Sequence, residues 1–276
     1  MRPLRDLLAA PLTALVAGLA LAVTALPAVA QQQPAPLREL ATADDGRGWE
    51  AVGRLNMGRH GFCTGALIEP QLVLTAAHCL YDRSSGRRFD PSEIEFLAGW
   101  RNGRAAAYRS ARRVATHPRY EYTGETRIDG VAFDIALIEL DQPIRVPSIQ
   151  PFEIDFEARR GDRVGVVSYA RDRSEAPSLQ EVCHVLGRQQ GALVLSCTVD
   201  FGASGAPIFS MAHGVPRIVS VVSAKAELDA QAVALGTALR EQLGVLRQVL
   251  AAGEMRFRRA ESGGARNDTG ARFVRP

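Results

Sequence analysis

Short apolar runs separated by turn residues recur along most of this chain, and this pattern restricts its fold more than any other feature. Each run has the length of a β-strand, and glycines and prolines stand between the runs. Long helical periodicity is rare, so the pattern predicts an all-β barrel or sandwich. The expected strands are 51–55, 64–68, 72–75, 94–98, 112–116 and 135–140, followed by 163–169, 180–186, 192–198, 206–209, 217–223 and 232–237.

Three prolines between residues 141 and 151 indicate a connection between two halves, 48–150 and 151–237. After the second half, four leucines are spaced by four, three and four residues, which predicts one amphipathic helix over 238–252. We expect this helix to pack on the second half; a helix on a membrane surface is the alternative. The leucines are Leu239, Leu243, Leu246 and Leu250.

Both ends of the chain differ from the middle. Residues 1–30 combine an arginine-containing start, an apolar run and a small-x-small site at residues 28–30, which is typical of a signal peptide; a membrane anchor is the alternative. Residues 31–47 are polar and indicate an extended N-terminal arm. Residues 253–276 are rich in arginine and glycine without apolar periodicity, which predicts a disordered tail. The mature protein is therefore expected to start near Gln31, without a stable membrane anchor, in a secreted or periplasmic location.

Charge and cysteine content narrow the function further. A net charge of +3 over 276 residues gives no reason to expect a nucleic acid partner. Four cysteines in an exported chain indicate disulfides, with three possible pairings. Cys63 with Cys79 and Cys183 with Cys197 would each close a short local loop. No CxxC pair exists, and no histidine spacing matches a metal motif, so we expect no metal and no cofactor.

The segment 200–207 offers one serine, Ser204, in a turn with Gly202 and Gly205 on either side. Glycine permits backbone angles that suit a tight turn, and such a turn exposes the hydroxyl and converges backbone N–H groups. A serine hydroxyl is a weak nucleophile that needs a base and an orienting acid.

Two earlier segments can supply these groups. His78 follows an apolar strand in Leu-Thr-Ala-Ala-His-Cys, and Asp134 opens Asp-Ile-Ala-Leu-Ile-Glu-Leu. A lone histidine is more often structural, and an aspartate before a strand can simply cap a turn. Asp129 is the near competitor, but its neighbours fit no such motif.

Together, these three segments resemble the trypsin/chymotrypsin-like serine peptidases, and among them the secreted bacterial members of the V8 (glutamyl endopeptidase) type. The order His, Asp, Ser along the chain distinguishes this family from subtilisins and α/β-hydrolases. The resemblance covers residues 48–252. It implies two six-stranded antiparallel β-barrels with the active site between them, a C-terminal helix, and a Cys63–Cys79 bridge beside the histidine.

The resemblance also implies roles for individual residues. His78 would act as general base, Asp134 would orient and stabilise it, and Ser204 would be the nucleophile. The N–H groups of Gly202 and Ser204 would form the oxyanion hole. Ala203 replaces the aspartate that pairs with a new N-terminus in activated zymogens, so we expect removal of the signal peptide or of a short arm to give an enzyme already folded for activity.

The substrate pocket is assigned by the same resemblance. Its floor would lie at Thr198 and Val199, and the segment Ser220–Val222 would bind the substrate backbone. Val219 takes the place of a histidine that V8-type enzymes use to bind glutamate, and Val222 replaces a glycine at the entrance. We therefore expect a small or apolar side chain at the cleaved position; Asp200 as a pocket acid is the alternative.

The sequence thus predicts a monomeric serine endopeptidase whose partner is a protein or peptide substrate. Two rival functions stay open. One is a binding protein on the same fold whose pocket is blocked, for instance by Val222. The other is an esterase that uses the same triad.

Overall fold

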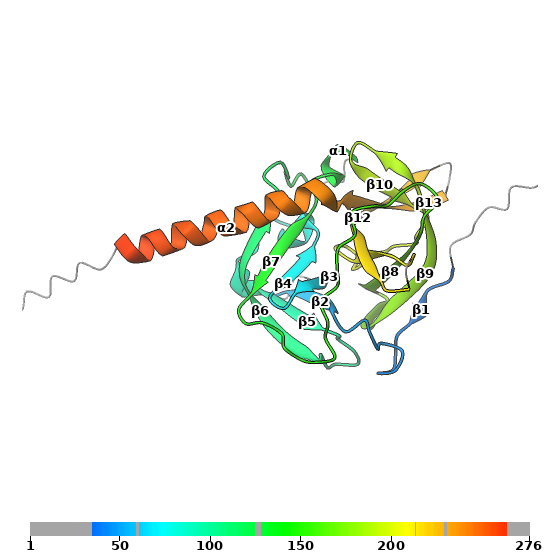
Figure 1. Cartoon of the computed structure of the whole chain (residues 1–276), viewed down its shortest axis with the longest axis horizontal. Helices are drawn as coiled ribbons and strands as arrows, with labels where there is room; N and C mark the ends of the chain where they lie inside the picture. Colours follow the sequence, from blue (N-terminus) through cyan, green and yellow to red (C-terminus); the bar gives the residue numbers. More distant parts are fainter. Residues whose placement is uncertain (1–34, 59–60, 125–127, 213, 229–230, 264–276) are drawn as a thin grey trace, which may run out of the picture. The chain divides into compact units, whose positions relative to one another are not determined.

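The computed structural model describes residues 35–58, 61–124, 128–212, 214–228 and 231–263. The expected signal peptide and residues 264–276 lie outside this part. The described strands form two closed antiparallel barrels, each of six strands, and a long helix follows them (Figure 1). The fold class expected from the sequence is confirmed. Among the described residues, no helix combines the length and the hydropathy needed to span a membrane.

The first barrel closes in the order β2-β3-β4-β7-β6-β5, with β5 paired back to β2. Two short 3-10 helices, η1 (Ala77–Leu80) and η2 (Pro91–Glu93), and the single-turn helix α1 (Ile128–Val131) lie in its connections. Its strands are β2 (Val52–Met57), β3 (Phe62–Glu69), β4 (Leu72–Thr75), β5 (Ile94–Ala98), β6 (Ala107–Thr116) and β7 (Ala136–Leu140).

The second barrel has the order β9-β10-β13-β12-β11-β8 and is closed by pairing of β8 with β9. Its strands are β8 (Arg163–Ala170), β9 (Arg173–Gln189), β10 (Ala192–Leu195), β11 (Pro207–Ser210), β12 (Arg217–Leu228) and β13 (Gln231–Ala238). Every strand predicted from the apolar runs is present, although β9 and β12 extend well beyond their predicted ends.

Buried side chains join the two barrels. Tyr169 of β8 is fully buried, its hydroxyl donates to the carbonyl of Trp100 over 2.8 Å, and its N–H donates to the hydroxyl of Thr64 over 3.1 Å. Burial raises the pKa of Tyr169 far above its ordinary value, so the hydroxyl stays neutral. Tyr169 therefore ties the second barrel to two points of the first, Thr64 near the start of β3 and Trp100 shortly after β5.

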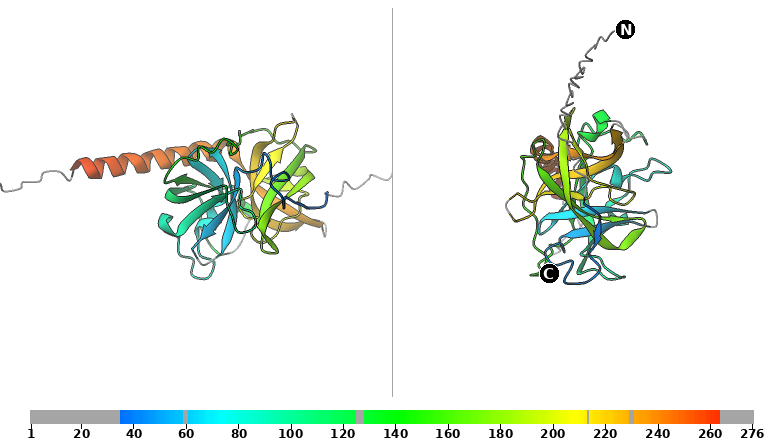
Figure 2. Two further views of the ribbon diagram at one scale, coloured as in Figure 1. Left: turned by 90° about the horizontal axis from the view of Figure 1, so that it is seen from below. Right: turned by 90° about the vertical axis from the view of Figure 1, so that its right-hand side faces the viewer.

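The C-terminal helix α2 (Leu239–Gly263) begins where the leucine spacing predicts, but its surroundings differ from the prediction. It packs mainly on β6 of the first barrel, as Figures 1 and 2 show, and makes smaller contacts with β7 and with β12 of the second barrel. Leu239, Leu243 and Leu246 are buried there, and the guanidinium of Arg113 on β6 donates to the carbonyl of Leu250.

The helix also continues to Gly263, into the segment predicted to be a disordered tail. The residues after 250 are mostly good helix formers, and Gly253, the one glycine before the terminal Gly263, costs the helix only about 1 kcal/mol. The leucine periodicity predicts only the part of the helix that packs against the barrels. The helix extends beyond this part, so the last leucine does not mark its end.

The predicted N-terminal arm is part of the packed structure from Ala35 onward. The short strand β1 (Arg38–Glu39) pairs antiparallel with β9, opposite Leu179 and Ser178. Leu40, directly after β1, is fully buried. The arm is thus docked on the second barrel, although its polar composition suggested an extended segment.

Candidate active site

A cleft of about 960 Å³ is lined by residues of both barrels. The three residues that the sequence singled out for catalysis all line it: His78 and Asp134 come from the first barrel, and Ser204 comes from the second. Asp129 lines the same cleft on α1, but Asp134 is the aspartate that contacts His78.

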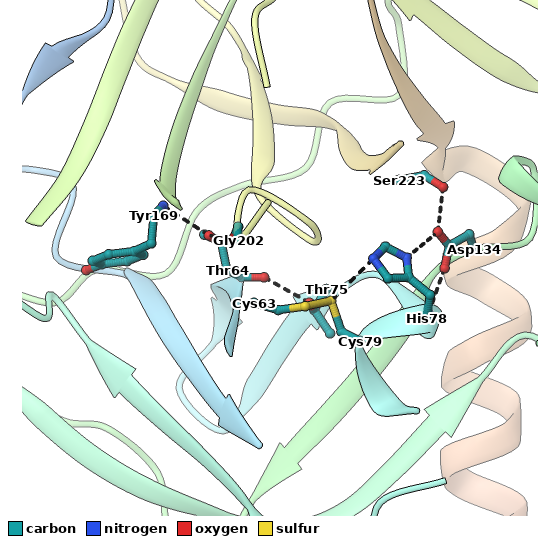
Figure 3. Close-up of a disulfide and its surroundings, with 9 residues drawn as sticks. All are labelled: Cys63, Thr64, Thr75, His78, Cys79, Asp134, Tyr169, Gly202 and Ser223. Carbon is teal, nitrogen blue, oxygen red and sulfur yellow. Dashed lines mark hydrogen bonds and ion pairs between the residues drawn. A yellow bond between two sulfur atoms is a disulfide. The ribbon is translucent and has the colours of Figure 1, made fainter. Parts of the chain in front are cut away.

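His78 lies in η1, immediately after the buried strand β4. The neighbouring Cys79 forms a disulfide with Cys63 of β3, as predicted, and thereby fixes the main chain beside the histidine (Figure 3). The second predicted disulfide, between Cys183 and Cys197, is also present. Cys63, His78 and Cys79 are close enough together to suggest a metal site, but both sulfurs are bonded to each other, and the thiolate is the form that binds a metal.

Asp134 holds His78 at two points. Its Oδ2 lies 2.7 Å from Nδ1 of the imidazole, and its Oδ1 accepts the backbone N–H of His78 over 2.8 Å. A carboxylate can only accept hydrogen bonds, so Nδ1 carries the hydrogen, and Nε2 of the neutral ring is the acceptor. The arrangement fixes the tautomer of an imidazole whose other nitrogen can take up a proton.

The pKa of His78 reflects opposing effects. Burial lowers it, the charge of Asp134 and the hydrogen bond to this carboxylate raise it, and the positive charge of Arg83 lowers it slightly. The effect of Asp134 prevails, so the pKa of His78 lies above its ordinary value.

Two residues that the sequence analysis missed hold Asp134 from the second barrel. Ser223 of β12 donates its hydroxyl to Asp134 Oδ2 over 2.5 Å (Figure 3). The hydroxyl of Thr237 on β13 lies 2.6 Å from the carbonyl oxygen of Val131 and 3.2 Å from that of Asp134. Both barrels therefore fix the position of this carboxylate.

Ser223 faces Asp134 because the pairing register of β12 with β13 shifts between Val222 and Ala224. Such an irregularity turns one side chain away from the regular alternation of a strand. The sequence could have indicated Ser223 only as a polar residue within an apolar strand. Ser220 of the same strand has the same property, so the sequence does not distinguish the two serines.

The turn that carries Ser204 depends on its two glycines. Gly202 and Gly205 have φ values of 100° and 75°, which side chains rarely tolerate. A Cβ at Gly205 would lie 2.1 Å from the Thr75 hydroxyl and 2.4 Å from the Thr64 carbonyl oxygen. The turn thus packs directly against strands β3 and β4.

Thr64 fixes this turn from the first barrel. Its N–H donates to the carbonyl of Ser204 over 2.9 Å, and its hydroxyl donates to the carbonyl of Gly202 over 2.9 Å. These two bonds set the orientation of the peptide groups that follow Gly202 and Ser204.

Two N–H groups of the turn remain available. The N–H groups of Ala203, Gly205 and Ala206 donate to carbonyls within or beside the turn. Those of Gly202 and Ser204 have no acceptor among the described residues. The carbonyl of Phe201 accepts from the N–H of Arg171 over 2.8 Å, and because a trans peptide places C=O and N–H on opposite sides, the N–H of Gly202 points the other way.

Ser204 and His78 line one cleft, but no hydrogen bond joins the Ser204 hydroxyl to Nε2 of His78 in the part of the chain that the structure describes. Nε2 lies 3.9 Å from the sulfur of Cys79. In enzymes without substrate such catalytic contacts are often long and tighten in the complex.

The predicted pocket residues are only partly brought together. Val199 and Val222 line the cleft, whereas Thr198 and Ser220 are not among its described lining residues. Ser220 is fully buried and its hydroxyl donates to the carbonyl of Thr237, so its assignment to the pocket is wrong. The N–H and C=O of Val222 are both bonded, to Ala206 and Gly205, so they are not free for substrate.

The wall of the cleft is instead formed by the next residues of β12, Ser223, Ala224 and Lys225. Lys225 Nζ lies 3.2 Å from Asp200 Oδ1 and 4.7 Å from the centre of the Phe201 ring. The hydrogen bond from the N–H of Phe201, followed by that from Lys225, lowers the pKa of Asp200. Asp200 is therefore an ion-paired residue at the cleft rather than a free acid in a pocket.

Comparison with known proteins decides the family. Residues 41–237 match the family model named Trypsin. This chain belongs to the trypsin family. Two curated relatives agree: the glutamyl endopeptidase of Bacillus licheniformis is 27% identical over 150 residues, and a trypsin of Phaedon cochleariae is 34% identical over 97 residues. These matches cover 54% and 34% of this chain but only 45% and 34% of the relatives, so the chain spans less than half the length of either.

Solved structures support the trypsin-family fold. A Glu endopeptidase superimposes with a TM-score of 0.63 at 16% identity, over 80% of this chain and 98% of the other. The protease Anisep from Arthrobacter nicotinovorans gives 0.59 at 17% identity, over 74% and 96%. An inactivated protease paralogue of the scabies mite gives 0.61 at 14% identity, over 79% and 97%. At these identities the likeness shows the fold alone.

Proposed function

We propose that this protein is a serine endopeptidase that hydrolyses peptide bonds through Ser204, His78 and Asp134. The observation that carries the proposal is the pairing of Asp134 with Nδ1 of His78 in a cleft that also contains Ser204. This pairing leaves Nε2 as the proton acceptor that a serine nucleophile requires.

The first half of the reaction forms an acyl-enzyme. Ser204 Oγ attacks the carbonyl carbon of the scissile peptide bond while Nε2 of His78 takes up its proton. The imidazolium that forms is stabilised by the carboxylate of Asp134. His78 then gives the proton to the leaving amine as the C–N bond breaks.

The negative oxygen that develops during attack needs hydrogen-bond donors. The N–H groups of Gly202 and Ser204 serve this role, because neither has an acceptor among the described residues and the peptide between Phe201 and Gly202 directs its carbonyl away. One such donor contributes about 3 kcal/mol in comparable enzymes.

The second half of the reaction removes the acyl group. A water molecule gives a proton to Nε2 of His78 and attacks the ester carbonyl, and the same two N–H groups stabilise the oxyanion. His78 returns the proton to Ser204 Oγ as the ester bond breaks, which restores the free enzyme.

The side chain at the cleaved position is small or apolar, since Val199, Val222 and Ala224 line the cleft. An acidic side chain is the competing candidate, because Lys225 lines the same cleft and one curated relative is named a glutamyl endopeptidase. Lys225 is already paired with Asp200, which favours the apolar preference.

The enzyme works outside the cytoplasm. Both disulfides persist in an oxidising compartment, and the signal-peptide pattern of residues 1–30 supports export.

A peptide-library cleavage profile of protein beginning at Gln31 tests the proposal. The Ser204→Ala variant should lose all cleavage, while Ser210→Ala, which changes a serine of β11 outside the lining of the cleft, should retain it. Cleavage that survives in Ser204→Ala would contradict the proposal.

The same preparation distinguishes the rival functions. Labelling of Ser204 by a fluorophosphonate together with peptide cleavage indicates a peptidase, and turnover of esters without amides would indicate an esterase. Absence of both labelling and cleavage would favour a binding protein, a role consistent with the inactivated paralogue that shares the fold.

A further inference from the structure

Residues 35–42, called here the N-terminal strap, contact both barrels. On the second barrel, the N–H of Ala35 donates to the carbonyl of Val182 over 2.9 Å, and that of Leu40 donates to Pro177 over 2.8 Å. On the first barrel, the side chains of Asn102 and Arg101 donate to the carbonyls of Ala41 and Thr42. The strap therefore lies along one edge of β9 and continues to a loop of the other barrel.

One buried side chain connects the strap with the cleft. Gln180 of β9 is 2% exposed. Its Nε2 donates to the carbonyl of Ala35 over 2.7 Å, and its Oε1 accepts the N–H of Thr198 over 2.8 Å. Both partners are main-chain groups with one possible role each, so the orientation of the amide is fixed.

Thr198 begins the segment that reaches the nucleophile. Cys197 is held by its disulfide to Cys183, and Val199 lines the cleft. Among the described residues, the bond from Thr198 to Gln180 is the one hydrogen bond found on the main chain of residues 197–199. Further along, Arg171 and Thr64 hold the turn itself.

We infer that the N-terminal strap is a positioning segment of the active enzyme, which acts through Gln180 on the main chain of Thr198 and thereby on Val199, the next residue, which lines the substrate cleft. This inference rests on the proposed peptidase function. Ala35 orients the amide of Gln180, and Gln180 in turn holds the main chain at Thr198. Without Ala35, the Nε2 group of a buried amide has lost its acceptor, and Gln180 is no longer confined to the rotamer that reaches Thr198.

This coupling has a consequence for processing. Cleavage near residue 30 leaves the strap intact, whereas cleavage after the half-exposed Arg38 removes Ala35 and leaves the buried Leu40 in place. The position of the N-terminal cut would thus set the affinity for substrate. This effect differs from zymogen activation through an aspartate before the nucleophile, because residue 203 is an alanine.

The test compares protein 31–276 with a chain that begins at Glu39, with Gln180→Met, and with both changes combined. Methionine keeps the length of the side chain but removes both hydrogen bonds. Gln189→Met, at the exposed end of the same strand, is the matched control. Steady-state kinetics on a cleaved peptide and hydrogen exchange of the segment 196–204 are measured for each protein.

We expect KM to rise about tenfold in the shortened chain and in Gln180→Met, with kcat changed less than about threefold, because Thr64 still holds the turn of Ser204. The combined variant should be no worse than either single variant, since both changes break one chain of contacts. A peptide of residues 31–38 added to the shortened chain should restore KM.

Hydrogen exchange gives a second readout that does not require activity. The shortened chain should exchange faster at residues 197–199, which form no hydrogen bond with the strap among the described residues, and the added peptide should reverse this. Unchanged exchange there would overturn the inference even if Gln180→Met fails to fold. A loss of thermal stability with unchanged KM would also overturn it, since that is the signature of a purely structural strap. A protein 31–276 that cleaves nothing would instead count against the proposed function, while the exchange result would still decide the coupling.

Discussion

Ser223 donates its hydroxyl to Asp134 Oδ2 over 2.5 Å, and the same carboxylate oxygen accepts the hydrogen of His78 Nδ1. The second barrel thereby orients the aspartate that orients the histidine. Replacement of Ser223 by alanine should lower kcat/KM about tenfold, since a hydrogen bond to a charged group contributes roughly 1.5 kcal/mol or more.

Steady-state kinetics on the best peptide substrate measure this effect. Ser220→Ala is the matched control, because it is a buried serine of the same strand whose hydroxyl bonds to the Thr237 carbonyl instead. Equal losses in both variants would mean that the effect arises from packing rather than from Asp134.

The pH dependence follows from the raised pKa of His78. Protonated imidazole cannot accept the proton of Ser204, so kcat/KM should fall as the pH drops through this pKa, above the ordinary histidine value of 6.5. Arg83 lowers this pKa, so Arg83→Met should move the acidic limb of the profile to higher pH. An acidic limb that moves to lower pH in this variant would contradict the assignment of His78 as the base.

The turn of Ser204 should tolerate no side chain at Gly205. Alanine there combines a φ of 75° with contacts of 2.1 and 2.4 Å to atoms of β3 and β4, so we expect destabilisation by several kcal/mol and loss of cleavage. Gly214→Ala is the control, with a similar φ of 73° and no atom within 4 Å of the added Cβ. It should cost only about 1 kcal/mol. Urea unfolding of both variants checks the difference.

Asp200 should limit the preference for acidic substrates. Asp200→Asn removes the charged partner of Lys225, which can then bind an acidic side chain of the substrate. The ratio of kcat/KM for glutamate over alanine at the cleaved position should therefore rise up to about fivefold, which corresponds to the free energy of an exposed ion pair. Lys225→Met should lower the same ratio. A ratio unaffected by either change would show that this ion pair lies outside the side-chain pocket.

Much of this protein was predictable because its signals are local. The apolar runs indicated every strand of both barrels, and the short motifs around His78, Asp134 and Ser204 identified three residues that the fold brings to one cleft. Strand alternation and turn glycines act within a few residues of the chain, so a single sequence displays them.

Other features depended on contacts between distant segments. Ser223 rather than Ser220 reaches Asp134 because β12 shifts its register against β13. The residues around the two serines are similarly apolar, so the local sequence does not show which of them contacts Asp134. Similarly, helix α2 packs mainly on the first barrel, and the polar arm buries one leucine, Leu40, directly after the strand that pairs with β9.

The sequence alone determined the class of fold and the chemical groups of the candidate site. Only the tertiary structure decided which residues hold those groups: Ser223 and Thr237 at Asp134, Thr64 at the turn, and Gln180 between strap and cleft. The physical reason is that a hydrogen bond between side chains of two barrels requires a register and an orientation that packing of the whole chain sets.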